Sequence, residues 1–135
     1  MIKEKLESYV QILNNIEDDQ DKFMWIMDFG KNNPGLHDQY KLKCFEVPGC
    51  QSQTWLVPHF LEDSIVFTAD SAALISKGMV CMLADVFSGA TSDEIKAFET
   101  KWLDGLKLEV LLTPGRNNGV YSMLKKIQHY AKKQD

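Results

Sequence analysis

The residue best suited to chemistry is Cys50, which lies in residues 47–55 with the sequence VPGCQSQTW. Pro48 and Gly49 favour a tight turn, and the polar residues after Cys50 set it apart from an apolar run. We therefore expect Cys50 at a loop tip just before a strand, where its thiolate can act as a nucleophile. Free thiols oxidise, so such a cysteine is best sheltered until a partner draws it out. The alternative is a structural turn cysteine without chemistry.

The two other cysteines fit different roles. Cys81 lies among Val80, Met82 and Leu83 on a predicted helix, which is typical of a packing residue. Cys44 either takes part in thiol exchange with Cys50 or packs within a strand. The cysteines lack C-x-x-C spacing and no histidine adjoins them in a motif, so we expect no metal site. A Cys-His hydrolase is disfavoured because nothing in the sequence orients a histidine.

Length and composition indicate one globular domain spanning residues 1–135, with 44% hydrophobic and 25% charged residues. The net charge of −4 argues against nucleic acid as a partner. No apolar run reaches the ~18 residues that a membrane span needs, and no apolar stretch of a signal peptide follows the N-terminus. We expect a cytoplasmic protein with reduced cysteines and no membrane association. The pairs Lys125-Lys126 and Lys132-Lys133 suit the C-terminal end of a helix or, alternatively, a basic docking patch.

The period of apolar residues changes to that of strands between residues 42 and 70. Residues 55–60 and 65–67 are rich in β-branched and aromatic types, and Glu62-Asp63-Ser64 between them predicts a hairpin turn. Lys43–Val47 is expected to add a third short strand. Pro58 indicates an edge strand or a bulge.

Helices are predicted on both sides of this sheet. Asp70 or Ser71 is the expected N-cap of a long helix that Gly89 ends. Gly78 inside that helix indicates close packing against another element. The predicted helices lie at residues 1–33 (two helices, ended by Asn33-Pro34-Gly35), 70–89, 91–98 (after the capping box Thr91-Ser92-Asp93-Glu94) and 113–131 (with Thr113 as N-cap and Pro114 as N1). The predicted fold class is α+β, with a small antiparallel three-stranded sheet packed against N-terminal and C-terminal helices.

Four segments resemble, in order, motifs of the SufE/CsdE family of cysteine desulfuration proteins. They are GCQSQTWL at 49–56, similar to G-C-Q-S-x-V-W; DSAALISKG at 70–78, similar to D-S-D-A-x-I-V-K-G; SGATSDEI at 88–95, similar to small-G-x-T-P-x-E-I; and LTPGRNNG at 112–119, similar to L-[ST]-P-S-R-x-x-G. A single match of this kind is weak, whereas four in the right order indicate the family.

The resemblance implies the α+β fold that SufE shares with IscU-type scaffolds. It also implies a sulfur acceptor and activator of a pyridoxal-phosphate-dependent cysteine desulfurase of the SufS or CsdA type. Cys50 would become a persulfide and pass its sulfur to an iron–sulfur scaffold complex of the SufBCD type. The desulfurase would hold the cofactor, so this chain is expected to hold none and to be no independent enzyme. The alternative is an IscU-type iron–sulfur or zinc scaffold.

Five residues are candidates for supporting the Cys50 loop: Gly49, Gln51, Ser52, Asp70 and Arg116. Arg116 lies in the first turn of a helix, where the dipole disfavours a cation, so we expect it to face Asp70 or the loop, the alternative being a solvated side chain. Gln51 and Ser52 either hydrogen-bond the loop or the sulfur, or only satisfy a turn. Asp70 is expected first as a helix cap.

Three positions depart from the family motifs. Ala72 stands where the family often has Asp, which changes the charge of a surface near the loop and bears on partner specificity. Gly115 replaces a serine. Leu111 occupies the position of a frequent histidine, so activation of the thiolate has to come from elsewhere.

Overall fold

The computed structural model describes residues 1–108 and 114–134, the side chains of residues 114–118 excepted. In chain order the elements are the helices α1 (Ile2–Asn14) and α2 (Asp19–Asn32), the 3₁₀ helices η1 (Asp38–Tyr40) and η2 (Lys43–Phe45), the strands β1 (Thr54–Phe60) and β2 (Ile65–Ser71), the helices α3 (Leu74–Phe87) and α4 (Ser92–Ala97), the 3₁₀ helix η3 (Thr100–Leu106) and the helix α5 (Pro114–Gln134). This arrangement confirms the α+β class.

The strands form a hairpin at the centre of the chain. β1 and β2 pair antiparallel from Thr54 opposite Ser71 to Phe60 opposite Ile65. The Leu61 N–H donates to the Ser64 carbonyl at 2.9 Å and closes the predicted turn. Pro58 lies opposite Phe67 in an uninterrupted register. An edge strand tolerates a proline here because the missing N–H would face away from the partner strand.

The predicted third strand at Lys43–Val47 is wrong. Residues 43–45 form η2, in which the Phe45 and Glu46 N–H groups donate to the Leu42 and Lys43 carbonyls. These local hydrogen bonds use the groups that a strand would offer its neighbour, and only a single bridge joins Glu46 to Trp55. Within the described residues the sheet therefore has two strands.

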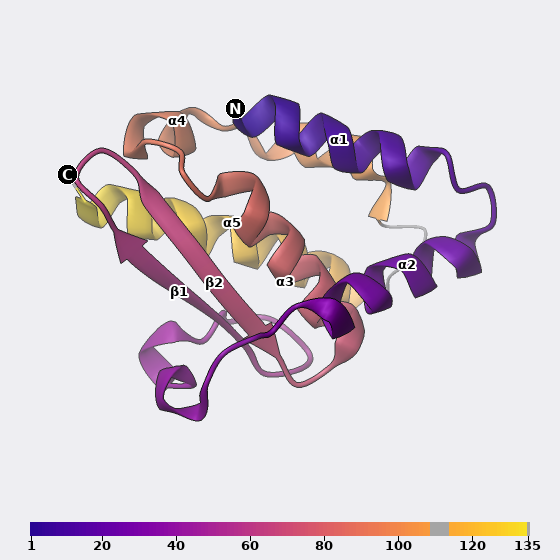
Figure 1. Ribbon diagram of the computed structural model, residues 1–135, viewed down its shortest axis with the longest axis horizontal. Coiled ribbons are helices and arrows are strands. Elements are labelled where there is room, and N and C mark those ends of the chain that lie inside the picture. The colour runs from indigo at the N-terminus through magenta and orange to yellow at the C-terminus, as the bar shows by residue number, and fades with distance from the viewer. Residues whose placement is uncertain (109–113, 135) are drawn as a thin grey trace.

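Helix α3 lies between the hairpin and α2, and α5 packs beside it against β1 (Figure 1). The predicted close packing at Gly78 is confirmed, because a side chain there would overlap the Ile26 carbonyl of α2. Gly30 of α2 faces the same point, where an added Cβ would lie 2.6 Å from the Gly78 nitrogen. Paired glycines thus let the backbones of α2 and α3 touch.

Local capping signals set several helix ends. Thr91 and Glu94 form the predicted capping box at the start of α4. Gly89 follows α3 with φ of 88°, a left-handed conformation that ends the helix. α5 begins at Pro114 as predicted, and its expected cap, Thr113, lies outside the described residues.

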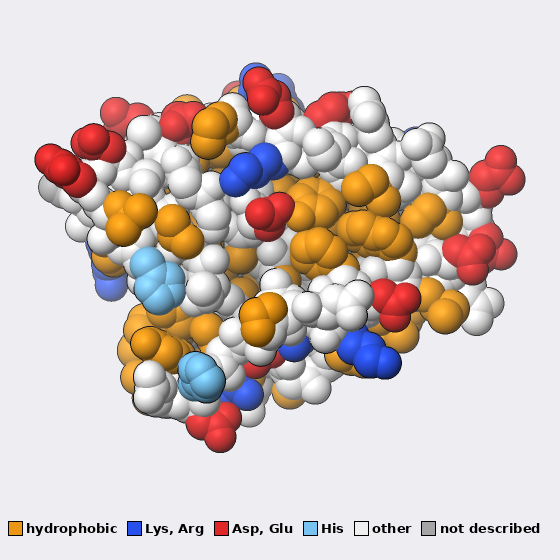
Figure 2. Space-filling model, viewed as in Figure 1, with side chains coloured by type: hydrophobic (Ala, Val, Ile, Leu, Met, Phe, Trp, Pro, Cys, Tyr) orange, Lys and Arg blue, Asp and Glu red, His pale blue; other side chains and the backbone are white. Residues whose placement is uncertain are grey.

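An aromatic cluster joins α1 to α2. Trp25 and Phe29 stack with ring centroids 5.5 Å apart, and Tyr9 meets Phe29 edge-on at 5.7 Å. Figure 2 shows hydrophobic side chains gathered on this face between the two helices. Of the helices in the described ranges, none combines the length and apolar character that crossing a membrane requires.

Candidate functional site

The Cys50 loop is held at its two ends by the start of the hairpin. The Val47 N–H donates to the Thr54 carbonyl at 2.8 Å, which closes residues 48–53 into a loop. Gly49 has φ of 83°, a left-handed conformation that glycine adopts without strain. The predicted tight turn before the cysteine is therefore present, and it presents Cys50 immediately before β1.

The tip of the loop rests on the first turns of α5. The Cys50 Sγ lies 3.9 Å from the Gly119 carbonyl oxygen, within reach of a weak S–H donor bond. A Cβ added at Gly119 would be 3.3 Å from that sulfur, and a Cβ added at Gly49 would be 2.9 Å from the Ser122 Oγ. Glycines on both sides of the contact thus allow the loop to lie this close to the helix.

The Cys50 thiol is half-buried in this position. Burial raises the pKa of the thiol above its ordinary value, because removing water disfavours the thiolate, and a hydrogen bond with the Thr54 side chain lowers it. The burial effect is the larger of the two. The thiol resting on α5 is accordingly protonated at neutral pH, which protects it from oxidants.

A hollow of about 460 Å³ opens beside the loop, lined by residues 46–54 together with Lys43 and Lys126. The Lys126 Nζ donates to the Cys44 carbonyl at 3.1 Å, which holds this cation at the edge of the hollow. Gly119, Ser122 and Lys126 follow one another at i, i+3 and i+7 along one face of α5. That spacing is the signal by which these loop contacts could have been found in the sequence.

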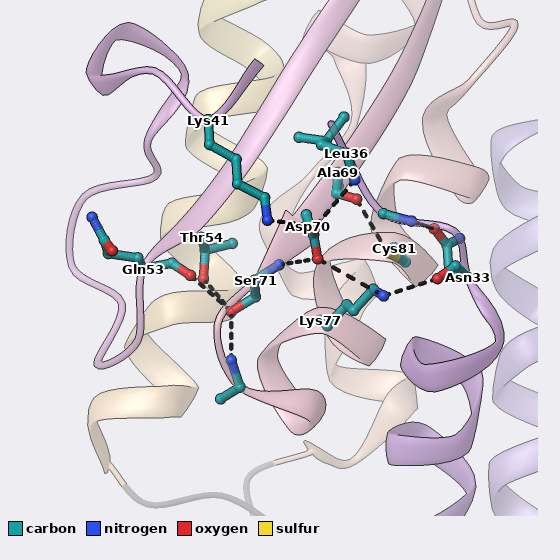
Figure 3. A network of polar contacts seen from close by, with 12 residues as sticks. Asn33, Leu36, Lys41, Gln53, Thr54, Ala69, Asp70, Ser71, Lys77 and Cys81 are labelled. Atoms are coloured by element: carbon teal, nitrogen blue, oxygen red, sulfur yellow. Dashed lines mark hydrogen bonds and ion pairs between the residues drawn. The ribbon is translucent and has the colours of Figure 1, made fainter. Parts of the chain in front are cut away.

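Asp70 joins β2 to the segment that follows α2 (Figure 3). Its carboxylate accepts hydrogen bonds from the Leu36 N–H at 3.0 Å and from the Ser71 N–H at 2.8 Å. It also lies 3.5 Å from the Lys41 Nζ and 3.8 Å from the Lys77 Nζ. Asp70 therefore links β2 to the segment after α2 and to α3.

The expectation that Asp70 or Ser71 caps α3 is wrong. The N-cap is Ala73, which makes no side-chain capping bond, and both residues still belong to β2. The strand continues to Ser71 because Thr54 opposite it begins β1. The Asp70 carboxylate is therefore directed at tertiary partners.

The remaining candidates lie as follows. Gln51 is exposed at the loop tip, and the Ser52 carbonyl accepts a hydrogen bond from the Thr54 hydroxyl at 3.0 Å. Ala72 is exposed and its N–H donates to the Gln53 carbonyl at 2.9 Å, so this departure from the family motif does lie beside the loop. The expected orientation of the Arg116 side chain falls outside the described residues, as does Leu111.

The other two cysteines do not contact the Cys50 thiol. Cys81 is buried on α3, as predicted, and its thiol donates to the Ala69 carbonyl at 3.7 Å. Cys44 is exposed on η2, so its expected packing in a strand is wrong. Among the described residues, no three His, Cys, Asp or Glu side chains gather in a group that could hold a metal ion.

Sequence reasoning did not single out three residues that the fold brings to this site: Thr54, Gly119 and Lys41. Thr54 is buried at the start of β1 and lines the same hollow as Cys50. Lys41 joins the Asp70 cluster and lies 5.5 Å from the centre of the Trp55 ring. Both of these Lys41 contacts depend on the path by which residues 33–41 return to the hairpin, and no local sequence pattern specifies that path.

Comparison with known proteins gives the same family as the motifs. SufE-like protein 1, chloroplastic/mitochondrial, from Arabidopsis thaliana is 34% identical over 128 residues, which make up 94% of this chain. The chain spans about a third (34%) of that relative's length. The solution structure of a hypothetical protein from Thermus thermophilus matches the fold with a TM-score of 0.77 at 16% identity, over 96% of this chain and 94% of that one.

The family model for SufE, described as an Fe-S metabolism associated domain, matches residues 7–131. This match contains the hairpin, the Cys50 loop and the described part of α5 up to Ala131. The chain belongs to the SufE family.

Proposed function

We propose that this chain accepts a sulfur atom on Cys50 from the persulfide of a pyridoxal-phosphate-dependent cysteine desulfurase. The observation that carries the proposal is the half-buried Cys50 thiol at a loop tip, resting on α5 through weak contacts. A thiol at such a position reacts when the loop moves outward and is sheltered when it returns. Membership of the SufE family supports the same assignment.

The transfer is a thiol–persulfide exchange. The Cys50 thiolate attacks the outer sulfur of the desulfurase's persulfide, a bond forms between the two sulfurs, and the desulfurase thiolate leaves. Cys50 then carries a persulfide, the proton of its thiol having passed to water. The electrons balance without an external oxidant, because the sulfur arrives already at the sulfane level.

The ends and the tip of the loop suit such a movement. The ends are held by the Val47–Thr54 hydrogen bond and the Glu46–Trp55 bridge. The tip is held by the 3.9 Å contact of Sγ with Gly119 and by packing of Gly49 on Ser122. A partner surface that offers better contacts can therefore lift the tip while the hairpin stays folded.

The acceptor of the sulfur is an iron–sulfur scaffold complex, and the transfer also activates the desulfurase by clearing its persulfide. The chain works as a sulfur carrier that needs the desulfurase to act. Since the chain spans a third of its Arabidopsis relative, the partners of that longer protein are not assumed for this one.

The test is to incubate the protein with a cysteine desulfurase and cysteine, and to measure its intact mass. The expected result is a gain of one sulfur atom that reduction removes. Cys44→Ser, which changes an exposed cysteine near the loop, is expected to gain the same mass, and Cys50→Ser is expected to gain none. The rate at which the desulfurase releases alanine is expected to rise with the wild type and not with Cys50→Ser.

An adduct that survives Cys50→Ser, or the absence of any adduct on the wild type, would overturn the proposal. Iron or zinc bound stoichiometrically by the purified protein would instead favour a scaffold.

A further inference from the structure

We propose that a basic ridge on α5 binds an acidic segment of the cysteine desulfurase and so brings this partner to the Cys50 loop. The ridge is defined by the cationic side chains and the histidine on one face of the helix: Lys125, Lys126, His129, Lys132 and Lys133. The inference rests on the proposed function of Cys50 as a sulfur acceptor, because it concerns how the sulfur donor reaches the loop.

The ridge occupies the side of α5 that faces away from the core. Its members follow one another at i, i+1, i+4, i+7 and i+8, which is the spacing of a single helical face. All of them are exposed except Lys126, which is half-buried. The opposite side of the helix packs into the core through Val120, Met123, Leu124, Ile127, Tyr130 and Ala131. From Lys125 to Lys133 the ridge is about 12 Å long.

Charge of one sign is concentrated on this helix. The chain carries 19 acidic and 15 basic residues, yet Pro114–Gln134 contains no Asp or Glu. Among the described residues, no lysine of the ridge forms an ion pair with a carboxylate. Opposite charges at i and i+4 stabilise an exposed helix, whereas like charges destabilise it. A face of one sign therefore reduces the stability of the helix itself and favours an anionic partner.

The helix dipole accounts for only one end of the ridge. Cations are stabilised in the last turn of a helix, and this effect falls off within that turn. Lys132 and Lys133 lie in the last turn of α5, but Lys125 and Lys126 lie about two turns before its end. Of the two roles considered for these lysine pairs, a docking patch is the one that includes the middle of the helix.

The ridge adjoins the Cys50 loop. Pro48 and Lys126 line the hollow that contains Cys50. They also line a second hollow of about 270 Å³, together with Ser122, Lys125 and His129. The Lys126 Nζ is held between the two, because it donates to the Cys44 carbonyl at 3.1 Å and lies 5.2 Å from the centre of the Tyr130 ring. A partner that contacts the ridge is therefore also beside the loop.

The resting position of the loop indicates which partner meets the ridge. The loop tip lies against Gly119 and Ser122 of α5, so a sulfur donor has to reach this helix in order to lift the tip. A later acceptor meets Cys50 after it has been loaded. Because the ridge is cationic, the complementary surface of the donor carries Asp and Glu side chains. The net charge of −4 argues against a nucleic acid as the occupant.

The test measures the rate constant of association with a pyridoxal-phosphate-loaded cysteine desulfurase. It is measured at about 0.1 M and at about 1 M salt, where the Debye length is about 10 Å and about 3 Å. Lys125→Glu/Lys133→Glu reverses two exposed charges and leaves the hydrogen bond of Lys126 in place. Its association is expected to be about tenfold slower than that of the wild type at the lower salt concentration. The two rate constants are expected to converge at the higher one, because salt screens the attraction.

Two further variants complete the test. Lys125→Gln/Lys133→Gln removes the two charges without reversing them. It is expected to show a smaller loss of the same kind, and it keeps the proposal testable where the doubly reversed variant does not fold. Lys22→Glu/Lys31→Glu on α2 makes the same change in net charge away from the ridge (Figure 1). This matched control is expected to associate at the rate of the wild type.

An association rate of Lys125→Glu/Lys133→Glu equal to that of the wild type at the lower salt concentration would overturn the proposal. A loss that persists unchanged at the higher concentration, or an equal loss in the α2 control, would also overturn it, because the ridge would then not act through its charge. The same conclusion would follow if the ridge bound a short single-stranded RNA while the desulfurase associated without any dependence on salt.

Failure of the ridge and failure of the proposed function give different results. Wild-type protein that gains sulfur on Cys50, although its association ignores the charge of the ridge, contradicts the ridge alone. An association that depends on the ridge and on salt, without any gain of sulfur, contradicts the sulfur transfer alone. No association with the desulfurase at either salt concentration overturns the ridge.

Discussion

At the scale of single residues, the protonation of the Cys50 thiol depends on two effects of opposite sign. Burial against Gly119 raises the pKa of the thiol, while Thr54 lowers it. The proposed sulfur transfer needs both a sheltered and a reactive form of the thiol, and a thiol on which opposing effects act changes form with a small displacement. The contact between Cys50 and α5 is therefore expected to set the reactivity of the thiol.

Gly119→Ala tests this dependence. The added methyl group would lie 3.3 Å from the Cys50 Sγ and 3.8 Å from its Cα, so the loop has to shift outward, whereas α5 gains from alanine in its interior. The expected result is alkylation of Cys50 several-fold faster at every pH, with a thermal midpoint no lower than that of the wild type. Exposed Cys44 in the same sample is the internal control, and an unchanged Cys50 rate would contradict the expectation.

Asp70 shows how much one buried carboxylate can hold. Its side chain is 11% exposed and lies between Lys41 and Lys77, whereas Asp38 contacts the same Lys41 from a position that is 99% exposed. Asp70→Asn is expected to lower the free energy of unfolding by about 2 kcal/mol, because it leaves the partly buried cations of Lys41 and Lys77 poorly paired. Asp38→Asn is expected to change it by less than about 0.5 kcal/mol. Equal losses of unfolding free energy for the two variants, measured by urea unfolding, would show that burial of the carboxylate does not decide how much it stabilises the fold.

At the scale of elements, the crossing of α2 and α3 fixes the frame on which the hairpin rests. Gly78→Ala places a methyl group on the Ile26 carbonyl, and backbone cannot move aside as a flexible side chain does. We expect a loss of about 3 kcal/mol in the free energy of unfolding. Gly105→Ala is the matched control, since its Cβ would lie 3.5 Å from a Val10 methyl group, an ordinary contact. A similar loss in both variants would contradict this explanation.

Helix ends marked by capping residues were predicted from the sequence, whereas one short segment and the contacts between distant residues were not. The capping box at Thr91 and the start of α5 at Pro114 follow from neighbouring residues. Lys43–Val47 has the composition of a strand, yet its first three residues form the 3₁₀ helix η2, because the backbone groups there bond locally. The motif around Cys50 predicted a loop thiol before a strand, whereas the contact between the Thr54 and Ser71 hydroxyls exists only because the hairpin pairs these two residues.

At the scale of the whole molecule, several acidic groups are buried in their neutral forms. Burial raises the pKa of Cys81 to about 12 and that of Tyr130 to about 12, and burial with the neighbouring Asp85 carboxylate raises that of Tyr9 further. Unfolding would expose each group to water, where it ionises at its ordinary pKa. At neutral pH these groups are protonated in both states, so their ionisation does not change the free energy of unfolding. Once the pH exceeds their ordinary pKa values, ionisation in the unfolded state lowers that free energy.

The sign for Cys81 gives a specific expectation. Below about pH 9, the ordinary pKa of the thiol, both states are protonated and stability does not depend on this group. Between about pH 9 and about pH 12 only the unfolded state loses its proton, so the free energy of unfolding falls by up to about 1.4 kcal/mol per pH unit. Cys81→Ala is expected to be less stable at neutral pH, because it loses packing, and to show a smaller fall in urea unfolding between about pH 8.5 and about pH 10. Cys44→Ala, which changes an exposed thiol, is expected to keep the fall of the wild type. If Cys81→Ala kept it as well, the buried thiol would not be its source, and the tyrosines would have to account for alkaline unfolding alone.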